Sequence, residues 1–301
     1  MESARNKKTQ EIEYAKDLLN QAQVDTENYE CWGCYLDMIP ASWRAENTKV
    51  QAYFRSKKGE RHAENCGAVE STELIRKAQK CSIRSELDAS PVLSPTGLKL
   101  NSKHLKVDNE IGKESSTQGA STRNSHNSTL TEAGNSHKRQ PAQSLYPIAH
   151  AFINFPNDRN MKLAIDGVFG NNYNTCFKNL PHEIYLNSKN KIFYAPLFWT
   201  NYNESLKDNS CLDIITINGK WENKKPKTTY TLHVDWKNWS QRAKTILINQ
   251  LNSTITDAKN NSEFKKKAWL FFIADQDKTN PKYYHVNDHR LLCAISALNF
   301  T

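Results

Sequence analysis

The sequence predicts an α+β protein in which a small metal-binding module, a disordered linker and a mixed sheet or barrel domain with one long helix follow one another. Three observations support this order. Residues 1–81 hold a cysteine and histidine pattern, residues 82–144 contain no aromatic side chain, and residues 145–301 alternate strand-like runs with turns around one helical stripe. The 301 residues suffice for two modest domains.

The first module is defined by its possible metal ligands. Cys31 and Cys34 stand in C-x2-C spacing, and His62 and Cys66 stand in H-x3-C spacing. Each pair suits one edge of a tetrahedral zinc site, and four protein ligands leave no position for water, so the ion would be structural. The alternatives are a redox-active C-x2-C or unrelated thiols, although no thioredoxin-type βαβ pattern surrounds the pair. We expect structural Zn2+ at these four residues.

Two helices are expected around this pattern. Ahead of it, Ile12, Ala15, Leu18 and Leu19 follow helical spacing, which predicts a short amphipathic N-terminal helix. Behind it, the stretch STELIRKAQK at 71–80 also reads as a helix.

Residues 29–67 resemble the zinc-binding N-terminal segment of competence protein CoiA-like bacterial proteins. The resemblance rests on CWGC followed by AYFRSKKGERHAENC. In that family a C-x2-C precedes a strand with a Phe-Arg-like element, and a His and a Cys follow. The resemblance assigns the ligands to the same four residues, although Arg55 here lacks the following histidine of the CoiA form. It implies a bacterial or mobile-element protein combined with nuclease or DNA-handling domains.

Residues 82–144 predict a disordered linker. They are crowded with Ser, Thr, Asn, Lys and Gly. Such a segment cannot bury enough apolar surface to offset the entropy lost on ordering.

The C-terminal domain, 145–301, is expected to contain several strands and one long helix. The strand-like runs are YPIAHAFINF, MKLAIDGVF, KIFYAPLFW, CLDIITI, TYTLHVDW, AWLFFIAD and KYYHVND. Trp239, Ala243, Leu247, Leu251 and Ile255 form one apolar stripe on the helix. This skeleton fits a five-stranded OB barrel or a nuclease core of the restriction-endonuclease type, and periodicity does not choose between them.

One hairpin in this domain resembles the PD-(D/E)xK nuclease pattern. Asp213 lies on its first strand, and Asp235 and Lys237 end the second. The resemblance implies that the two carboxylates hold Mg2+ and that the lysine orients or deprotonates the attacking water. Asp235 has an alternative role as the N-terminal cap of the following helix. Elsewhere, His285 and His289 could mimic a metal pair, but no third ligand is evident from the sequence.

The charge favours a polyanionic partner. Lys and Arg number 41 against 32 Asp and Glu, for a net charge of +9. Nucleic acid, DNA first, is the expected partner, because each phosphate contact releases counterions. The candidate binding residues combine basic and aromatic side chains in the module and in the hairpin loop. They are Arg55, Lys57, Lys58, Lys220, Trp221, Lys224, Lys225 and Lys227.

Two further expectations concern the class of protein. No segment approaches the roughly 18 uninterrupted apolar residues that span a bilayer, so we expect no membrane partner. The N-terminus lacks the apolar core of a secretory signal, so we expect a cytoplasmic protein. Three functions remain open: nucleic-acid binding, Mg2+-dependent cleavage, and a protein-interaction adaptor whose basic charge is incidental. Trp199, Tyr202, Trp236 and Trp239 are expected to be core residues.

Overall fold

The computed structural model describes the chain on both sides of residues 101–140. The residues described are 1, 3–18, 21, 23–44, 52–63, 66–68, 71–89, 92–100, 141–181, 185–186, 189–202, 210–223, 225–298 and 300. They contain both helices and strands, as the α+β prediction requires. Within them, no helix is both long enough and apolar enough to cross a membrane.

The N-terminal part is a five-stranded antiparallel sheet of short strands, in the order β2-β1-β3-β4-β5. The strands are β1 Ser3–Asn6, β2 Ile12–Tyr14, β3 Tyr29–Glu30, β4 Asp37–Ala41 and β5 Tyr53–Ser56. Met38 and Phe54 are buried in the core beneath this sheet, together with Cys31 and Cys66. Two of the four metal-ligand candidates therefore belong to the core of this part.

The N-terminal helix predicted from the apolar spacing is mostly wrong. Residues Ile12–Tyr14 form β2, and among the described residues of this stretch the helix is confined to one turn, α1 at Ala15–Leu18. Leu19 lies outside the described residues. The buried carboxylate of Glu13 explains the preference for a strand. It accepts hydrogen bonds from Asn6 Nδ2 at 2.7 Å and from Tyr29 Oη at 3.1 Å, and both donors lie on other strands of the sheet. A buried charge needs such partners, and strand pairing supplies them.

The ordered structure extends further into the predicted linker than the composition indicated. Helix α2 covers Ser71–Ala78, as expected, but α3 then covers Arg84–Ala89. Ile83 and Leu87 are buried in the larger core, and the buried Asp158 accepts hydrogen bonds from Ser82 Oγ at 2.5 Å and Ile83 N at 2.9 Å. Only a few apolar side chains were needed to anchor this segment. Of the predicted linker, residues 101–140 lie outside the described residues.

The two ends of that interval meet in space. Leu98 bridges Ala142, and Gly97 bridges Ala164. The backbone N–H of Lys99 donates to the Ala142 carbonyl at 2.8 Å, and the Ala142 N–H donates to the Gly97 carbonyl at 2.8 Å. Residues 97–99 and residue 142 are therefore hydrogen-bonded neighbours.

Two of the predicted C-terminal strands are not strands. YPIAHAFINF lies in helix α4, Leu145–Asn154, where Pro147 occupies the first turn and so interrupts no helical hydrogen bond. Its apolar residues come nearly without interruption, so periodicity alone did not separate a buried strand from a buried helix. The run at 161–169 is irregular and makes only isolated bridges, Lys162 to Asn172 and Ala164 to Gly97.

The other five predicted runs contain strands β7, β8, β9, β10 and β12, which form two four-stranded sheets together with β6, β11 and β13. One has the order β13-β10-β7-β6 and the other β11-β12-β9-β8, and a bridge from Leu197 to Thr216 joins β7 to β8. Their bounds are β6 Phe177–Asn179, β7 Ile192–Pro196, β8 Cys211–Glu222, β9 Lys225–Asp235, β10 Lys267–Phe272, β11 Asp275–Gln276, β12 Tyr283–Val286 and β13 Leu292–Ala297. The choice between an OB barrel and a nuclease-type core stays a prediction.

The remaining helical elements are mostly short. They are α5 Tyr173–Cys176 and the 3-10 turns Pro156–Asp158, Ser262–Phe264 and His289–Leu291. The long helix α6 covers Gln241–Asn260 and packs against β10 and β13. The predicted stripe from Ala243 to Ile255 is buried, but Trp239 precedes the helix, and Ser240 is the N-cap.

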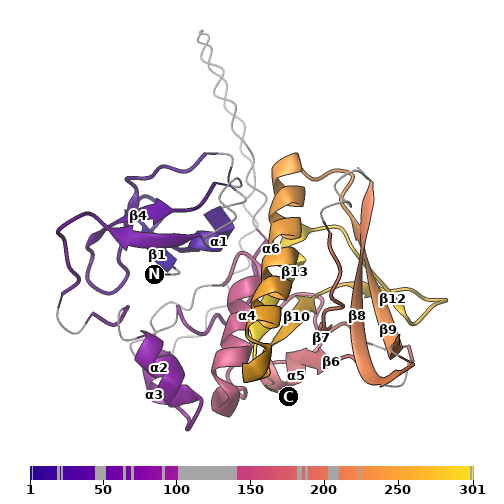
Figure 1. The fold of residues 1–301 in the computed structure, drawn as a ribbon. Helices are drawn as coiled ribbons and strands as arrows, with labels where there is room; N and C mark the ends of the chain where they lie inside the picture. The colour runs from indigo at the N-terminus through magenta and orange to yellow at the C-terminus, as the bar shows by residue number, and fades with distance from the viewer. Residues whose placement is uncertain are drawn as a thin grey trace, which may run out of the picture.

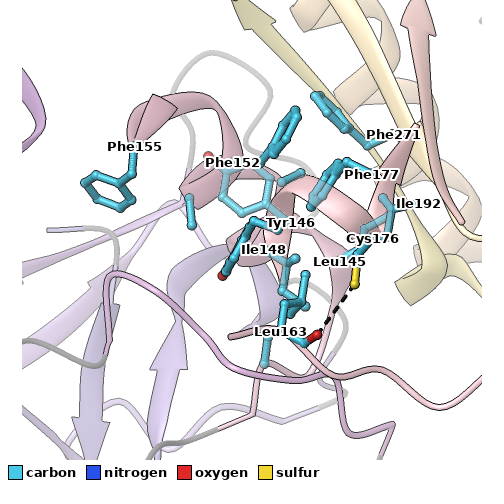
Figure 2. Packing of buried hydrophobic residues seen from close by; sticks show 14 of the residues in the cluster. Leu145, Tyr146, Ile148, Phe152, Phe155, Leu163, Cys176, Phe177, Ile192 and Phe271 are labelled. Atoms are coloured by element: carbon cyan, nitrogen blue, oxygen red, sulfur yellow. Dashed lines mark hydrogen bonds between the residues drawn. The ribbon is translucent and has the colours of Figure 1, made fainter. Parts of the chain in front are cut away.

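Aromatic packing holds α4 onto the first C-terminal sheet. The rings of Phe152 and Phe177 stack with centroids 3.9 Å apart, and Phe271 of β10 meets Phe177 edge-on at 6.2 Å. Figure 2 shows these rings together with Cys176, whose thiol donates to the carbonyl of Leu163. Such ring pairs add roughly 0.5–1.5 kcal/mol each beyond the area they bury.

The N-terminal sheet lies on one side of α4 and α6, and the C-terminal sheets lie on the other (Figure 1). Arg242 of α6 donates to the carbonyl oxygens of Trp43 at 3.1 Å and Leu18 at 3.5 Å. At α4, Ser144 Oγ donates to Asp17 Oδ1 at 2.7 Å. Burial raises the pKa of Asp17 from 3.8 to about 6, and the Ser144 hydrogen bond offsets only part of that effect.

This raised pKa predicts pH-dependent stability. The folded protein binds a proton at Asp17 more tightly than the unfolded chain, so the stabilisation is complete below pH 4 and is lost as the pH rises through 6. We expect Asp17→Asn to raise the free energy of unfolding at pH 7.5 by on the order of 2 kcal/mol and to change it little at pH 4. Urea denaturation at both pH values measures this.

Asp25→Asn is the matched control for this prediction. Asp25 is exposed beside Lys8, with 2.8 Å between the charged atoms, and its pKa is lowered mainly by that hydrogen bond. Its substitution should give no gain at pH 7.5. Equal effects of the two substitutions, or a gain for Asp17→Asn that does not depend on pH, would contradict the prediction.

Candidate functional site

The four predicted ligands converge in the N-terminal part. The ligand atoms of Cys31, Cys34, His62 and Cys66 all lie within 4.8 Å of one another, so one metal ion could contact all four. Cys31 Sγ is 3.5 Å from Cys66 Sγ, and His62 Nδ1 is 3.3 Å from Cys34 Sγ and 3.6 Å from Cys66 Sγ. No other group of three or more such side chains occurs among the described residues.

The C-x2-C turn is shaped by backbone hydrogen bonds. Cys31 N donates to the Leu36 carbonyl at 2.7 Å, and Tyr35 N donates back to the Cys31 carbonyl at 2.9 Å. Gly33 N points at Cys31 Sγ from 3.4 Å. This turn holds both thiols on the same side, toward the loop that carries His62.

The pKa values of the two thiols in the turn shift in opposite directions. Burial raises the pKa of Cys31 to about 12. Burial would also raise that of Cys34, but hydrogen bonds from Ala63 N and Leu36 N and from His62 outweigh it and lower the pKa to about 6. One ligand is therefore readily ionised, whereas Cys31 must give up its proton when a metal binds.

Gly33 is needed for the close approach of the two halves of this group. A Cβ at this position would lie 2.9 Å from Cys66 Sγ and 3.0 Å from Ala68 N. A Cβ at Gly67 would meet only Trp32, at 3.7 Å, which is ordinary contact. The two glycines therefore differ in what a methyl group would do there.

We expect Gly33→Ala to lower the metal content of the purified protein severalfold, because the methyl group forces Cys66 away from Cys31. Elemental analysis of the folded protein measures this. Gly67→Ala is the control and should keep the metal content of the unmodified chain. Full metal content in Gly33→Ala would show that the two halves are not held at the distance described.

The basic residues predicted for the module have varied surroundings. Arg55 and Lys58 are exposed. Lys57 Nζ pairs with Asp37 Oδ2 at 2.8 Å, and the same carboxylate pairs with Lys7. Hydrogen bonds from both lysines lower the pKa of Asp37 to about 2. Arg55 and Lys58 are thus better placed than Lys57 to meet a phosphate.

The predicted hairpin loop is only partly described. Lys225 and Lys227 are exposed at the start of β9, and Lys227 Nζ pairs with Glu222 Oε1 at 2.9 Å. The side chains of Lys220 and Trp221, and all of Lys224, lie outside the described residues.

The nuclease residues make local contacts on the second sheet. Asp213 Oδ1 lies 2.7 Å from His233 Nδ1, and Asp235 Oδ1 accepts from Lys237 N at 3.2 Å. Both carboxylates are exposed. The alternative role of Asp235 as a helix cap is wrong, since Ser240 accepts from Ala243 N at the start of α6. Mg2+ binding and catalysis by Asp213, Asp235 and Lys237 stay predictions.

A second candidate surface lies where β6 meets the loops around it, and we call it the aromatic–lysine patch. It consists of Phe169, Lys178, Tyr185, Lys189 and Lys191. Phe169 and Tyr185 are 52% and 47% exposed. The ammonium groups of Lys189 and Lys191 lie 3.5 and 4.5 Å from the centre of the Phe169 ring, and that of Lys178 lies 5.0 Å from the centre of the Tyr185 ring.

Hydrogen bonds fix the loop that carries Phe169. Lys191 Nζ donates to the carbonyl oxygens of Phe169 at 2.8 Å and Thr175 at 2.5 Å. Gly170 has φ +142, and a Cβ there would lie 2.8 Å from Cys176. The loop therefore packs directly on α5 while the Phe169 ring stays exposed.

The lysines of the patch repel one another. Desolvation lowers the pKa of Lys191, and the like charges of Lys178 and Lys189 lower it further. No carboxylate is within ion-pair distance of Lys189 or Lys191 among the described residues. An anion bound here would relieve the repulsion.

The sequence did not predict this patch, because the run at 161–169 has the composition of a strand. Two features of the sequence could have indicated the patch. They are the glycines on either side of Val168 and Phe169 and the lysines in KNK at 189–191. Trp199, predicted to be core, is also 47% exposed, with Lys259 Nζ 5.6 Å from its ring, whereas Tyr202 and Trp236 are buried as predicted.

Comparison with protein-family models, with curated proteins and with solved structures finds no match to this chain. The resemblances to CoiA-like and PD-(D/E)xK proteins therefore stay predictions, and the function has to be argued from the two surfaces described above.

Proposed function

We propose that this protein is a zinc-stabilised nucleic-acid-binding protein that contacts single-stranded segments through the aromatic–lysine patch. The observation that carries the proposal is the position of three lysine ammonium groups, which lie within 5.0 Å of the centres of two exposed aromatic rings. Bases stack on exposed rings, and lysines neutralise the phosphates between them.

Zinc is the metal that best fits the Cys3His group. In a tetrahedral site with Zn–S about 2.3 Å and Zn–N about 2.1 Å, sulfur atoms lie about 3.8 Å apart and sulfur and nitrogen about 3.6 Å apart. The observed separations are 3.5 Å between Cys31 and Cys66 and 3.3 and 3.6 Å from His62 to two sulfur atoms. Three thiolates and one imidazole also match the ligand preference of zinc.

All four zinc positions would be filled by the protein, so the ion would be structural. Two of the ligands, Cys31 and Cys66, are already part of the N-terminal core. Metal binding would then contribute directly to the stability of that part.

We expect the purified protein to contain about one zinc per chain, and Cys34→Ser to remove it and to lower the melting temperature of the N-terminal part. Cys81→Ser is the control, because Cys81 is exposed and donates only to the Lys77 carbonyl. Elemental analysis and thermal unfolding test this. Loss of zinc in both variants, or in neither, would contradict the assignment.

Nucleic-acid binding is tested by fluorescence anisotropy with a labelled single-stranded oligonucleotide. Phe169→Ala should weaken binding roughly 5- to 150-fold, the range that loss of one stacked base gives. The double variant K178Q/K189Q should lower the salt slope of log K by about 1.4, the value for two phosphate contacts on a single strand. Lys191 is left in place because it also supports the Phe169 loop.

The matched control is K225Q/K227Q, which removes two positive charges from the hairpin predicted from the sequence. Weaker binding in this variant, with no effect of K178Q/K189Q, would place the contact on the hairpin instead of the patch. Affinity that does not fall with rising salt for the unmodified protein would exclude nucleic acid and favour a protein partner.

A further inference from the structure

A row of polar side chains crosses the second C-terminal sheet. Strand β8 pairs with β9 so that Asp213 stands opposite His233, and β9 pairs with β12 so that His233 stands opposite His285. Residues in register on neighbouring strands project from the same face. The adjacent residues Leu232, Val234, Tyr284 and Val286 are all buried. The row therefore lies on the solvent-facing side.

Each histidine of the row is held by a carboxylate. His233 Nδ1 lies 2.7 Å from Asp213 Oδ1, and His285 Nε2 lies 3.4 Å from Asp277 Oδ2. Asp277 is itself fixed, because its Oδ1 accepts from Thr279 N at 2.7 Å and from Asn280 N at 2.8 Å. One oxygen of Asp277 is thus occupied by the turn, and the other faces His285.

We propose that His233 and His285 form a second metal site for a divalent transition-metal ion, with Asp213 and Asp277 as the carboxylates that orient them. Metal-binding histidines typically bond a carboxylate through the ring nitrogen that does not meet the metal. The ring nitrogens that do not face a carboxylate are His233 Nε2 and His285 Nδ1, and these would bind the metal. The described residues provide no hydrogen-bond partner for either nitrogen.

The spacing of the two rings fits a shared ion. A metal about 2.1 Å from one nitrogen of each ring, at a tetrahedral angle, places the ring centres about 5 Å apart. The observed centroid separation of His233 and His285 is 5.5 Å. The separation of the ring centres is therefore compatible with one ion bound between them.

The ligand types select the class of metal. Two imidazoles favour Zn2+, Ni2+ or Cu2+ over Mg2+ or Ca2+. The row does not form a closed group of three ligand atoms among the described residues, so water would complete the coordination sphere. The site would be open, unlike the Cys3His group, and open sites can exchange ligands.

His289, the partner that the H-x3-H spacing suggested for His285, is engaged elsewhere. Its ring packs against Trp239, with centroids 5.3 Å apart, and its Nδ1 lies 3.9 Å from Asp288. Its pKa is lowered by burial. The cross-strand neighbour His233, not the sequence neighbour, completes the pair.

Isothermal titration of the zinc-loaded full-length protein with Ni2+ tests this proposal. We expect about one Ni2+ per chain beyond the resident zinc, and at least about tenfold weaker binding in His233→Gln and in His285→Gln. Asp277→Asn keeps an oxygen for the Thr279 and Asn280 amides and should weaken binding about tenfold. His150→Gln, on α4, is the matched control and should bind like the unmodified chain.

The absence of Ni2+ binding beyond the zinc, or unchanged binding in both histidine variants, would overturn the proposal. A second measurement needs no variant. Paramagnetic Ni2+ should broaden the imidazole NMR signals of His233 and His285 first, and broadening that begins at other histidines would also overturn it. Neither result depends on nucleic-acid binding.

Discussion

The Cys3His group is the constraint on which the N-terminal part depends. The strands of its sheet are two to five residues long, and the buried cluster beneath them is small. A core of this size rarely stabilises a fold without a covalent or metal cross-link. The group connects the turn after β3 with the segment that follows β5, so one ion would close the sheet from its middle to its edge.

The sequence predicted those structural features whose residues lie close together along the chain. The spacing of Cys31, Cys34, His62 and Cys66 predicted a cluster that the structure brings together, because each pair closes a short turn. The stripe on α6 was an equally local signal, and it was correct from Ala243 to Ile255, although Trp239 precedes the helix. The strand at Ile12–Tyr14 was not predicted. The hydrogen bonds that favour a strand there come from Asn6 and Tyr29, which lie on other strands.

The surfaces that could act chemically are built from contacts distant in sequence. Phe169 is accompanied by lysines some twenty residues further on, and His233 by His285 on a strand beyond α6. His233 and His285 are neighbours because β9 and β12 pair in parallel. Parallel pairing requires a long crossover connection, which no short sequence motif predicts. The motif predicted a role for Asp213 but not its hydrogen-bond partner, His233, which lies on the neighbouring strand.

The bridge between Leu98 and Ala142 has a consequence for how this protein tolerates change in length. The two segments that the bridge joins lie side by side, so residues 98 and 142 are close together in space. For any flexible loop, each doubling of length adds only about 0.6 kcal/mol to the entropic cost of closing it. A flexible sequence added between residues 98 and 142 would therefore need to span almost no distance, and the bridge between these two residues could keep its register.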